Sequence, residues 1–305
     1  MKRLMMLMLT ASLLLCGCSP LVDEDQTIDL YASFYPLYAL MEGLTRDIPD
    51  LHLHCLVQPQ DGCLRDYALS DWDLYLLASS ADAVIMGGRG LESFESTLFS
   101  LGDHGPAVSA VLYNLDLLNQ DDAVTSDEEA THFDGPNPHL YMSAAGAVQI
   151  LESMNASLIS LDPEYTAIYE ANLEKARSKL EALQKEIQSI SESIAGKKAI
   201  VMNEALAYTA ADFKLETVLT IERESGTALY DSELDVCLET LTKEDAQVIL
   251  IEKQAPETFV NRLQEAGYTV IRIDIFADHV IPGGFEDYLQ TQKKNAEAIA
   301  DAFST

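Results

Sequence analysis

The chain has 305 residues, 48% of them hydrophobic, which is enough to fill two cores of ordinary size and excludes a disordered chain. It carries 50 acidic and 19 basic residues, a formal net charge of −31. Because nucleic acids and anionic lipid headgroups are bound through clustered Lys and Arg, this balance excludes a nucleic-acid partner and charge-driven docking on a membrane.

The N-terminus has the pattern of an export signal. Lys2 and Arg3 precede an apolar run over residues 4–15, which is too short to span a bilayer. The run ends in Leu-Cys-Gly-Cys, which resembles the cleavage site of bacterial lipoproteins. That resemblance implies a signal peptide over residues 1–17, a lipidated Cys18 and an extracytoplasmic protein anchored to the membrane by its acyl chains. The alternative is an ordinary secretory signal.

A polar tether over residues 18–26 leads into alternating strand and helix patterns. Short apolar runs predict strands over 28–33, 51–57, 83–86 and 108–113, and helical spacing lies between them at 37–44 and 70–81. This alternation is typical of a parallel sheet. Residues 119–136 interrupt it with an acidic polar loop, and a helical run follows over 143–158. We expect an N-terminal β/α domain over residues 27–160.

Two cysteines of this first domain are close in sequence. Cys55 and Cys63 would close a short loop, and disulfides persist in exported proteins. We therefore expect a Cys55–Cys63 disulfide, with two unlinked thiols as the alternative. Cys237 has no evident partner and is expected to be a small buried residue.

A long helix is the clearest single element. Asp162 followed by Pro163 predicts its start, with Asp162 as the N-cap, and Gly196 predicts its end. Apolar residues between them recur at steps of three and four, which indicates one stripe on one helix about 48 Å long. We expect a linking helix over residues 161–196, and a coiled coil is the alternative.

The remaining residues repeat the strand–helix alternation. Strands are predicted over 198–202, 218–221, 248–251 and 270–273, and a helix over 290–303 ends the chain. These elements predict a C-terminal β/α domain over residues 197–305.

Several strings, in this order, resemble the solute-binding proteins of zinc and manganese ABC transporters. They are ASFYPLYAL (32–40), SADAVIMGGRGLESF (80–94), NPHLYMSA (137–144), LDPEYTAIYEANLEKARSKLEAL (161–183) and AQVILIEKQAPETFVNRLQEAGYTVIRID (246–274). The resemblance covers residues 28–303. It implies an α/β fold with two parallel-sheet domains, a long linking helix and a ligand cleft between the domains. It also implies a monomeric binding subunit that delivers a divalent metal ion, Zn or Mn, to an ABC permease and its ATPase.

The resemblance also implies a ligand set of three histidines and one carboxylate. His139 matches one of the histidines, and Asp274 matches the carboxylate. The other two histidine positions hold Arg65 and Glu204. A guanidinium cannot ligate a metal, because it stays protonated and has no lone pair to donate. Arg65 can instead pair with Glu204 across the cleft.

Two interpretations of the cleft remain open. In the first, His139, Glu204 and Asp274 bind a metal, and this oxygen-rich set shifts the preference from zinc toward manganese or iron. In the second, Arg65 binds an anionic small molecule or a metal chelate. A cleft without a small ligand is a third alternative. Ligands of open α/β sheets lie beyond the carboxyl ends of strands, which adds these candidate cleft residues: Asp66, Asn203 and Glu252.

Three other histidines are weaker candidates. His52 and His54 alternate on one strand and therefore face the same side of the sheet, and His279 follows the last strand as an extra ligand candidate. The glycines around Arg89 lack a phosphate-binding spacing and predict a tight turn. The sequence has no HExxH, GxSxG or P-loop motif, so we expect no catalytic residues and no enzyme. An extracellular enzyme and a surface adhesion module are the alternatives from other functional classes.

Overall fold

Two parallel β-sheets form the framework of the molecule. The computed structural model describes residues 27–58, 64–102, 105–119, 123–124, 135–221 and 231–304. The strand order is β2-β1-β3-β4 in the first sheet and β5-β7-β6-β8-β9 in the second, and all of the pairings are parallel. The first sheet contains β1 (Ile28–Ala32), β2 (Leu51–Cys55), β3 (Ala83–Met86) and β4 (Ala107–Ala110). The second contains β5 (Ala123–Val124), β6 (Lys198–Val201), β7 (Glu216–Ile221), β8 (Val248–Glu252) and β9 (Thr269–Ile273).

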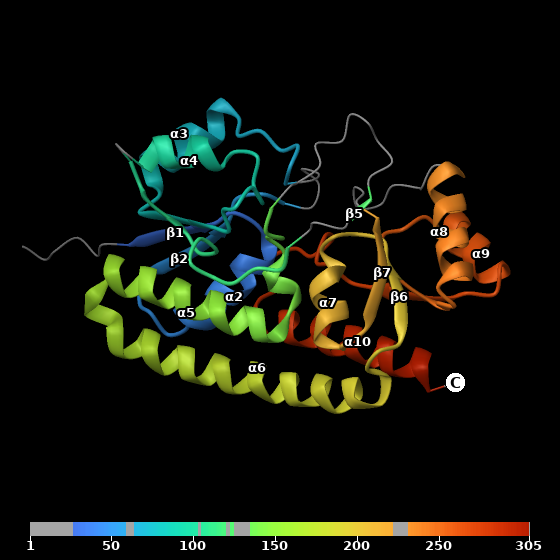
Figure 1. The fold of residues 1–305 in the computed structure, drawn as a ribbon. Helices are drawn as coiled ribbons and strands as arrows, with labels where there is room; N and C mark the ends of the chain where they lie inside the picture. Colours follow the sequence, from blue (N-terminus) through green and yellow to red (C-terminus); the bar gives the residue numbers. More distant parts are fainter. Residues whose placement is uncertain are drawn as a thin grey trace, which may run out of the picture.

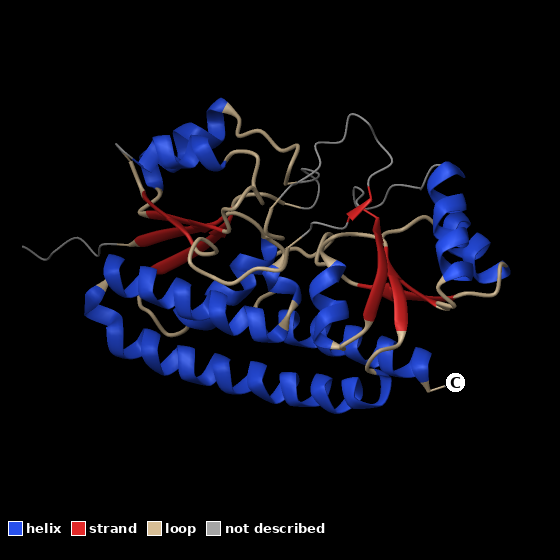
Figure 2. Cartoon of the chain, viewed as in Figure 1, coloured by secondary structure: helices blue, strands red, loops and turns tan. Residues whose placement is uncertain are grey.

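Helices cover both faces of each sheet, as βαβ units require. Figure 1 shows α3 and α4 on one face of the first sheet, with α2 and α5 on the other, and α8 and α9 on the outer side of the second sheet. The helices are α2 (Tyr35–Thr45), α3 (Asp71–Ser80), α4 (Glu95–Gly102), α5 (Ala144–Leu161), α6 (Thr166–Ile194), α7 (Leu206–Asp212), α8 (Asp231–Lys243), α9 (Glu257–Glu265) and α10 (Phe285–Phe303). Two sets of strands stand apart in Figure 2, and α6 runs beneath both. This arrangement confirms the predicted fold class.

The apolar stripe of α6 is buried as its spacing predicts. It packs against α2, α5 and α10 of the same chain, so α6 is not a coiled-coil strand. The buried apolar residues of α6 are Tyr169, Ala176, Leu180, Leu183, Ile187 and Ile194. Over 29 residues the helix reaches about 44 Å, long enough to lie along both sheets. Gly196 adopts φ +74°, the left-handed conformation that ends a helix.

The predicted N-cap of this helix is wrong. A 3₁₀ turn over Pro163–Tyr165 precedes α6, and the side chain of Asp162 caps neither element. Its carboxylate accepts a hydrogen bond from the hydroxyl of Tyr169 at 3.2 Å instead. A buried phenol requires an acceptor, and this requirement takes the carboxylate away from the cap.

Two elements link the N-terminal half of the chain to the C-terminal half. β5 comes from the stretch predicted to be a loop, yet it pairs with β7 in the second sheet. α10 follows the last strand and packs against α2 near the start of the chain. The approach of these helices is close: a Cβ on Gly43 of α2 would lie 2.9 Å from the ring of Phe285. The proposed domain boundaries therefore remain predictions, because residues cross between the two halves.

Some predicted features lie outside the described residues. They include the signal peptide, Cys18 and Cys63, so the lipidation site and the Cys55–Cys63 disulfide remain predictions. Within the described part of the chain, no helix is long and apolar enough to cross a membrane. Cys237 is fully buried, as expected.

A partly buried carboxylate of α7 joins the two halves at the start of α5. Asp212 accepts hydrogen bonds from the hydroxyl of Ser143 at 2.9 Å and from the backbone N–H of Ala144 at 3.3 Å. Burial raises the pKa of Asp212 to about 6, although both hydrogen bonds oppose this shift. The folded state therefore holds a proton here that the unfolded chain releases near pH 4.

This shift predicts a pH dependence of stability. A raised carboxyl pKa contributes stability that is present below pH 4 and is lost as the pH rises through about 6. Denaturant titrations at pH 4 and pH 7 measure this dependence. From pH 4 to pH 7, the free energy of unfolding of the wild-type protein should fall by up to about 3 kcal/mol more than that of Asp212→Asn. The control is Glu170→Gln, which changes an exposed carboxylate of α6. An equal loss in wild type and Asp212→Asn would contradict the prediction.

Candidate metal centre

His139 presents one imidazole nitrogen toward Glu204. It precedes a 3₁₀ turn over Leu140–Met142 and is 8% exposed. The amide of Asn137 donates to the backbone carbonyl of Glu204 at 2.8 Å, so its Oδ1 atom is the acceptor that lies 2.9 Å from Nδ1 of His139. Nδ1 therefore carries the proton, and Nε2 keeps its lone pair for a ligand.

Burial keeps this imidazole neutral. It lowers the pKa of His139 to about 4, with Glu204 opposing the shift and Arg65 adding to it. A neutral imidazole is the form that binds metal ions.

Arg65 and Glu204 form an ion pair between the two halves of the chain. Nη2 of Arg65 lies 2.9 Å from Oε1 of Glu204, and this oxygen is 4.0 Å from Nε2 of His139. This pairing was predicted from the family resemblance, because a guanidinium at Arg65 cannot ligate a metal and can pair with Glu204 instead. The guanidinium thus occupies a position beside the carboxylate that a metal ion would otherwise take.

Glu204 is only partly satisfied by this pair. It is 6% exposed, and its Oε2 atom is buried without a hydrogen-bond partner among the described residues. An unsatisfied buried carboxylate oxygen is energetically costly, and a bound cation would remove that cost.

Asp274 belongs to a separate group of donor atoms. It follows β9, and its Oδ2 atom lies 3.1 Å from Nε2 of His279 and 3.1 Å from Nζ of Lys253. Asp274, Asp278 and His279, hereafter the Asp274 cluster, have donor atoms within 4.8 Å of one another. In the described residues no other group of three His, Cys, Asp or Glu side chains meets this distance. His139 and Glu204 are therefore not joined to Asp274 in this structure.

Aromatic rings connect the two groups. The rings of Tyr141 and Phe276 lie between the two histidines. The centroid distances along this row are 5.9 Å from His139 to Tyr141, 6.4 Å from Tyr141 to Phe276 and 5.2 Å from Phe276 to His279. His139 and His279 are therefore linked by a row of ring contacts, hereafter the aromatic layer.

Hydrogen bonds stabilise the charged form of Asp274. Burial would raise its pKa, but bonds from His279, from the backbone N–H of Phe276 and from Lys253 lower it to about 2. Asn295 of α10 fixes the backbone on both sides, accepting from the N–H of Asp274 at 2.9 Å and donating to its carbonyl at 2.9 Å. The carboxylate is thus a fixed anion at neutral pH.

The other predicted cleft residues differ in exposure. Glu252 ends β8 and is fully buried. Asn203 is 5% exposed, and its side chain accepts from the N–H of Ala205 at 2.9 Å. Asp66 is exposed.

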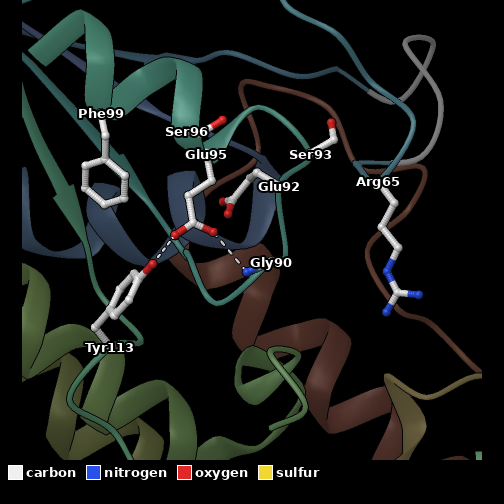
Figure 3. Close-up of a pocket in the computed structure, with 8 residues that line it drawn as sticks. All are labelled: Arg65, Gly90, Glu92, Ser93, Glu95, Ser96, Phe99 and Tyr113. Atoms are coloured by element: carbon white, nitrogen blue, oxygen red, sulfur yellow. Dashed lines mark hydrogen bonds between the residues drawn. The ribbon is translucent and has the colours of Figure 1, made fainter. Parts of the chain in front are cut away.

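Arg65 also borders a cavity of about 510 Å³ on the first sheet's side of the molecule (Figure 3). Glu95 points into it and is hydrogen-bonded to the hydroxyl of Tyr113 and to the N–H of Gly90. Arg65 lies across the cavity from Glu95. The acidic wall makes this cavity a poor receptor for an anion.

Glu92 fixes the turn beside this cavity. It accepts hydrogen bonds from the backbone N–H groups of Gly87 and Gly88 and from the hydroxyl of Ser33. Burial raises its pKa, against these bonds. Gly88 has φ +78°, consistent with the tight turn predicted here.

His52 and His54 lie on one face of the first sheet, as their alternation predicts. Nε2 of His54 is 2.7 Å from Oδ1 of Asp29, and Nδ1 of His52 is 3.5 Å from the same oxygen. Asp29 lies near the start of β1, and His52 near the start of β2. Both histidines therefore lie beside Asp29 of β1 in the first sheet, whereas Asp274 follows β9 of the second sheet.

Sequence reasoning missed the partners of the Asp274 cluster. Asp278, Lys253 and Asp287 come from three different segments: Lys253 directly follows β8, Asp278 lies in the loop after β9, and Asp287 lies in α10. The spacing of Asp274 and His279 was the one available signal for this group.

Comparison with known proteins identifies the relatives of this chain. The family model described as zinc-uptake complex component A, periplasmic, matches residues 30–302. The chain belongs to this family.

Known proteins resemble the chain at low identity. Zinc-binding lipoprotein AdcA of Streptococcus pneumoniae is 21% identical over 98% of this chain, and the chain spans 60% of its length. Metal ABC transporter substrate-binding lipoprotein ScbA of Streptococcus cristatus is 23% identical, with 99% of this chain and 98% of ScbA covered. The solved structure of FpvC from Pseudomonas aeruginosa with Mn²⁺ matches with a TM-score of 0.75 at 18% identity, covering 92% of this chain and 99% of FpvC. The family predicted from the sequence is confirmed.

The ion pair predicts a measurable dependence of stability on Arg65. Arg65→Ala leaves Glu204 buried without its cation and should lower the free energy of unfolding by about 1–3 kcal/mol in metal-free protein. Adding Glu204→Gln to this variant should restore most of the loss, because the uncompensated charge is removed. Denaturant titration of the two variants and wild type measures the coupling. An Arg65→Ala variant as stable as wild type would contradict a stabilising pair.

Proposed function

We propose that the protein captures a divalent metal ion, Zn or Mn, outside the cytoplasmic membrane and delivers it to an ABC permease and its ATPase. The observation that carries this proposal is the buried neutral imidazole of His139, whose Nε2 lies 4.0 Å from a buried carboxylate oxygen of Glu204. The family and fold are those of substrate-binding transport components, which supports binding without catalysis.

The donor types suit a metal ion, although this structure does not bring Asp274 within 4.8 Å of both His139 and Glu204. His139, Glu204 and Asp274 are the proposed ligands and offer one nitrogen and two carboxylates. Oxygen donors favour Mn²⁺ over Zn²⁺, relative to a site with three histidines. The unsatisfied Oε2 atom of Glu204 supports a cation at this place.

Arg65 is the residue that opposes metal binding. Its guanidinium contacts the oxygen of Glu204 that the ion requires, and its charge repels the ion. Its side chain is 30% exposed, so it has room to move toward solvent. Arg65 therefore acts as an internal competitor that lowers affinity.

The anionic-ligand alternative has less support. It requires Arg65 to leave Glu204, and the adjacent cavity carries Glu92 and Glu95. The adhesion alternative remains a prediction without a specific observation in its favour.

Metal binding should raise the melting temperature. An ion at 100 times its Kd stabilises the folded state by about 2.7 kcal/mol, a shift of several degrees in differential scanning fluorimetry with Zn²⁺ or Mn²⁺. His139→Ala should remove most of the shift, and the exposed His52→Ala is the matched control. Arg65→His should increase the shift with Zn²⁺, because it replaces a repelling cation with a nitrogen donor.

Two outcomes would change the proposal. A shift in Arg65→His but not in wild type would show a disabled metal site. No shift in either protein would exclude metal capture and direct attention to anionic ligands of Arg65.

We further propose that lipidated Cys18 anchors the protein. The lipoprotein names of AdcA and ScbA support the signal pattern found in this chain. Cys18→Ala should move the protein from the membrane fraction to the soluble or unprocessed fraction, since the acyl chains supply the affinity. Cys16→Ala, two residues away in the same signal, is the matched control. Membrane retention of Cys18→Ala at the wild-type level would count against lipidation.

A further inference from the structure

We infer that His279 is a metal ligand and that it supplies the imidazole missing at the position of Arg65. The inference rests on the proposed function, because it assigns a further ligand to the same cargo ion. It concerns a residue that lies outside the family's ligand positions named above.

His279 already converges with the proposed carboxylate ligand. Its Nε2 atom is 3.1 Å from Oδ2 of Asp274, and Asp278 brings a third donor within 4.8 Å. Imidazole combined with carboxylates is a donor set that suits Zn²⁺ and Mn²⁺.

The ring of His279 is oriented as metal-binding histidines are. Its Nδ1 atom lies 2.7 Å from Oδ2 of Asp287, which accepts the Nδ1 proton, while Nε2 faces Asp274 and donates its own proton there until a metal ion takes the place of that proton. Tyr35 donates its hydroxyl to the same carboxylate at 2.5 Å, so Asp287 is itself held in place. A carboxylate behind the histidine is the usual support of a metal ligand.

Packing fixes the ring further. Its centroid is 5.1 Å from that of Tyr35 and 5.2 Å from that of Phe276, and the side chain is 13% exposed. A preorganised ligand loses little conformational entropy when the ion binds.

The cluster already attracts a cation. Nζ of Lys253 lies 3.1 Å from Asp274 and 3.3 Å from Asp278. The side chain of Lys253 is 50% exposed, so it can withdraw into solvent when a divalent ion arrives. A cavity of about 310 Å³, lined in part by Lys253, Asp278 and His279, adjoins the cluster and provides access.

His279 is also well placed compared with the other histidines of the described segments. There are four of these, and His52 and His54 lie beside Asp29 of the first sheet. His139 and His279 are linked through the neighbouring rings of Tyr141 and Phe276. His279 is thus the imidazole that these ring contacts connect to His139.

The test is isothermal titration of the metal-free full mature chain with Mn²⁺ and Zn²⁺, with X-ray absorption on the zinc-loaded protein. His279→Ala should weaken metal binding at least about 10–100-fold, because that is the loss seen when only the hydrogen-bond partner behind a ligand is removed. The zinc absorption spectrum of this variant should show one imidazole ligand in place of two. Asp287→Asn should weaken binding within that range. Lys253→Gln should strengthen it, and His52→Ala should leave it unchanged.

The outcomes separate the two proposals. If wild type binds neither ion, the proposed function fails. If wild type binds and His279→Ala binds equally well with the same imidazole count, the inference is overturned while metal capture stands. If His279→Ala does not fold, judged by the melting temperature of metal-free protein, the Asp287→Asn and Lys253→Gln pair decides, and unchanged affinity in both overturns the inference.

Discussion

A buried carboxylate requires a cation, and the cation beside Glu204 sets the state of the whole cleft. Desolvation of a carboxylate costs several kcal/mol unless an opposite charge compensates for it. In this protein the compensation comes from Arg65, a residue of the other half of the chain, at 2.9 Å. The Arg65–Glu204 ion pair therefore lies at two of the family's ligand positions. A metal ion that binds here must displace the guanidinium of Arg65 from Glu204.

Asp274 is a second carboxylate with a cation beside it. Asp274 is held ionised by His279, by the N–H of Phe276 and by Lys253, which again places a side-chain ammonium beside a candidate ligand. Arg65 and Lys253 differ in exposure, at 30% and 50% of their side chains. The lysine is the more easily displaced of the two, because its charge is closer to solvent.

Most of the fold follows from local patterns in the sequence. Continuous apolar runs such as residues 83–86 become strands buried on both faces, and the three-four spacing of α6 becomes one buried stripe. The two-residue strand β5 had no such pattern, because it depends on pairing with β7 about 95 residues later. The N-cap assigned to Asp162 failed because a tertiary contact with Tyr169 outweighed the local rule.

The candidate site was predictable only through the family resemblance and the rule that ligands lie beyond the carboxyl ends of strands. These named His139, Glu204, Arg65 and Asp274 as candidates, and the inability of a guanidinium to ligate a metal led to the predicted pairing of Arg65 with Glu204. The support of His279 was not predictable, because the hydroxyl of Tyr35 and the carboxylate of Asp287 are 252 positions apart. No periodicity connects residues so distant, and only the packing of α10 on α2 brings them together.

That packing has a consequence for how such chains recombine. The last helix lies against the first, with Phe285 over Gly43 and Asp287 bonded to Tyr35. A chimera joined within α6 would combine α2 of one parent with α10 of another, so its interface would be foreign even though each sheet kept its own strands. Functional hybrids between relatives should therefore require α10 to be inherited together with α2, which makes the two ends of the gene one unit of exchange.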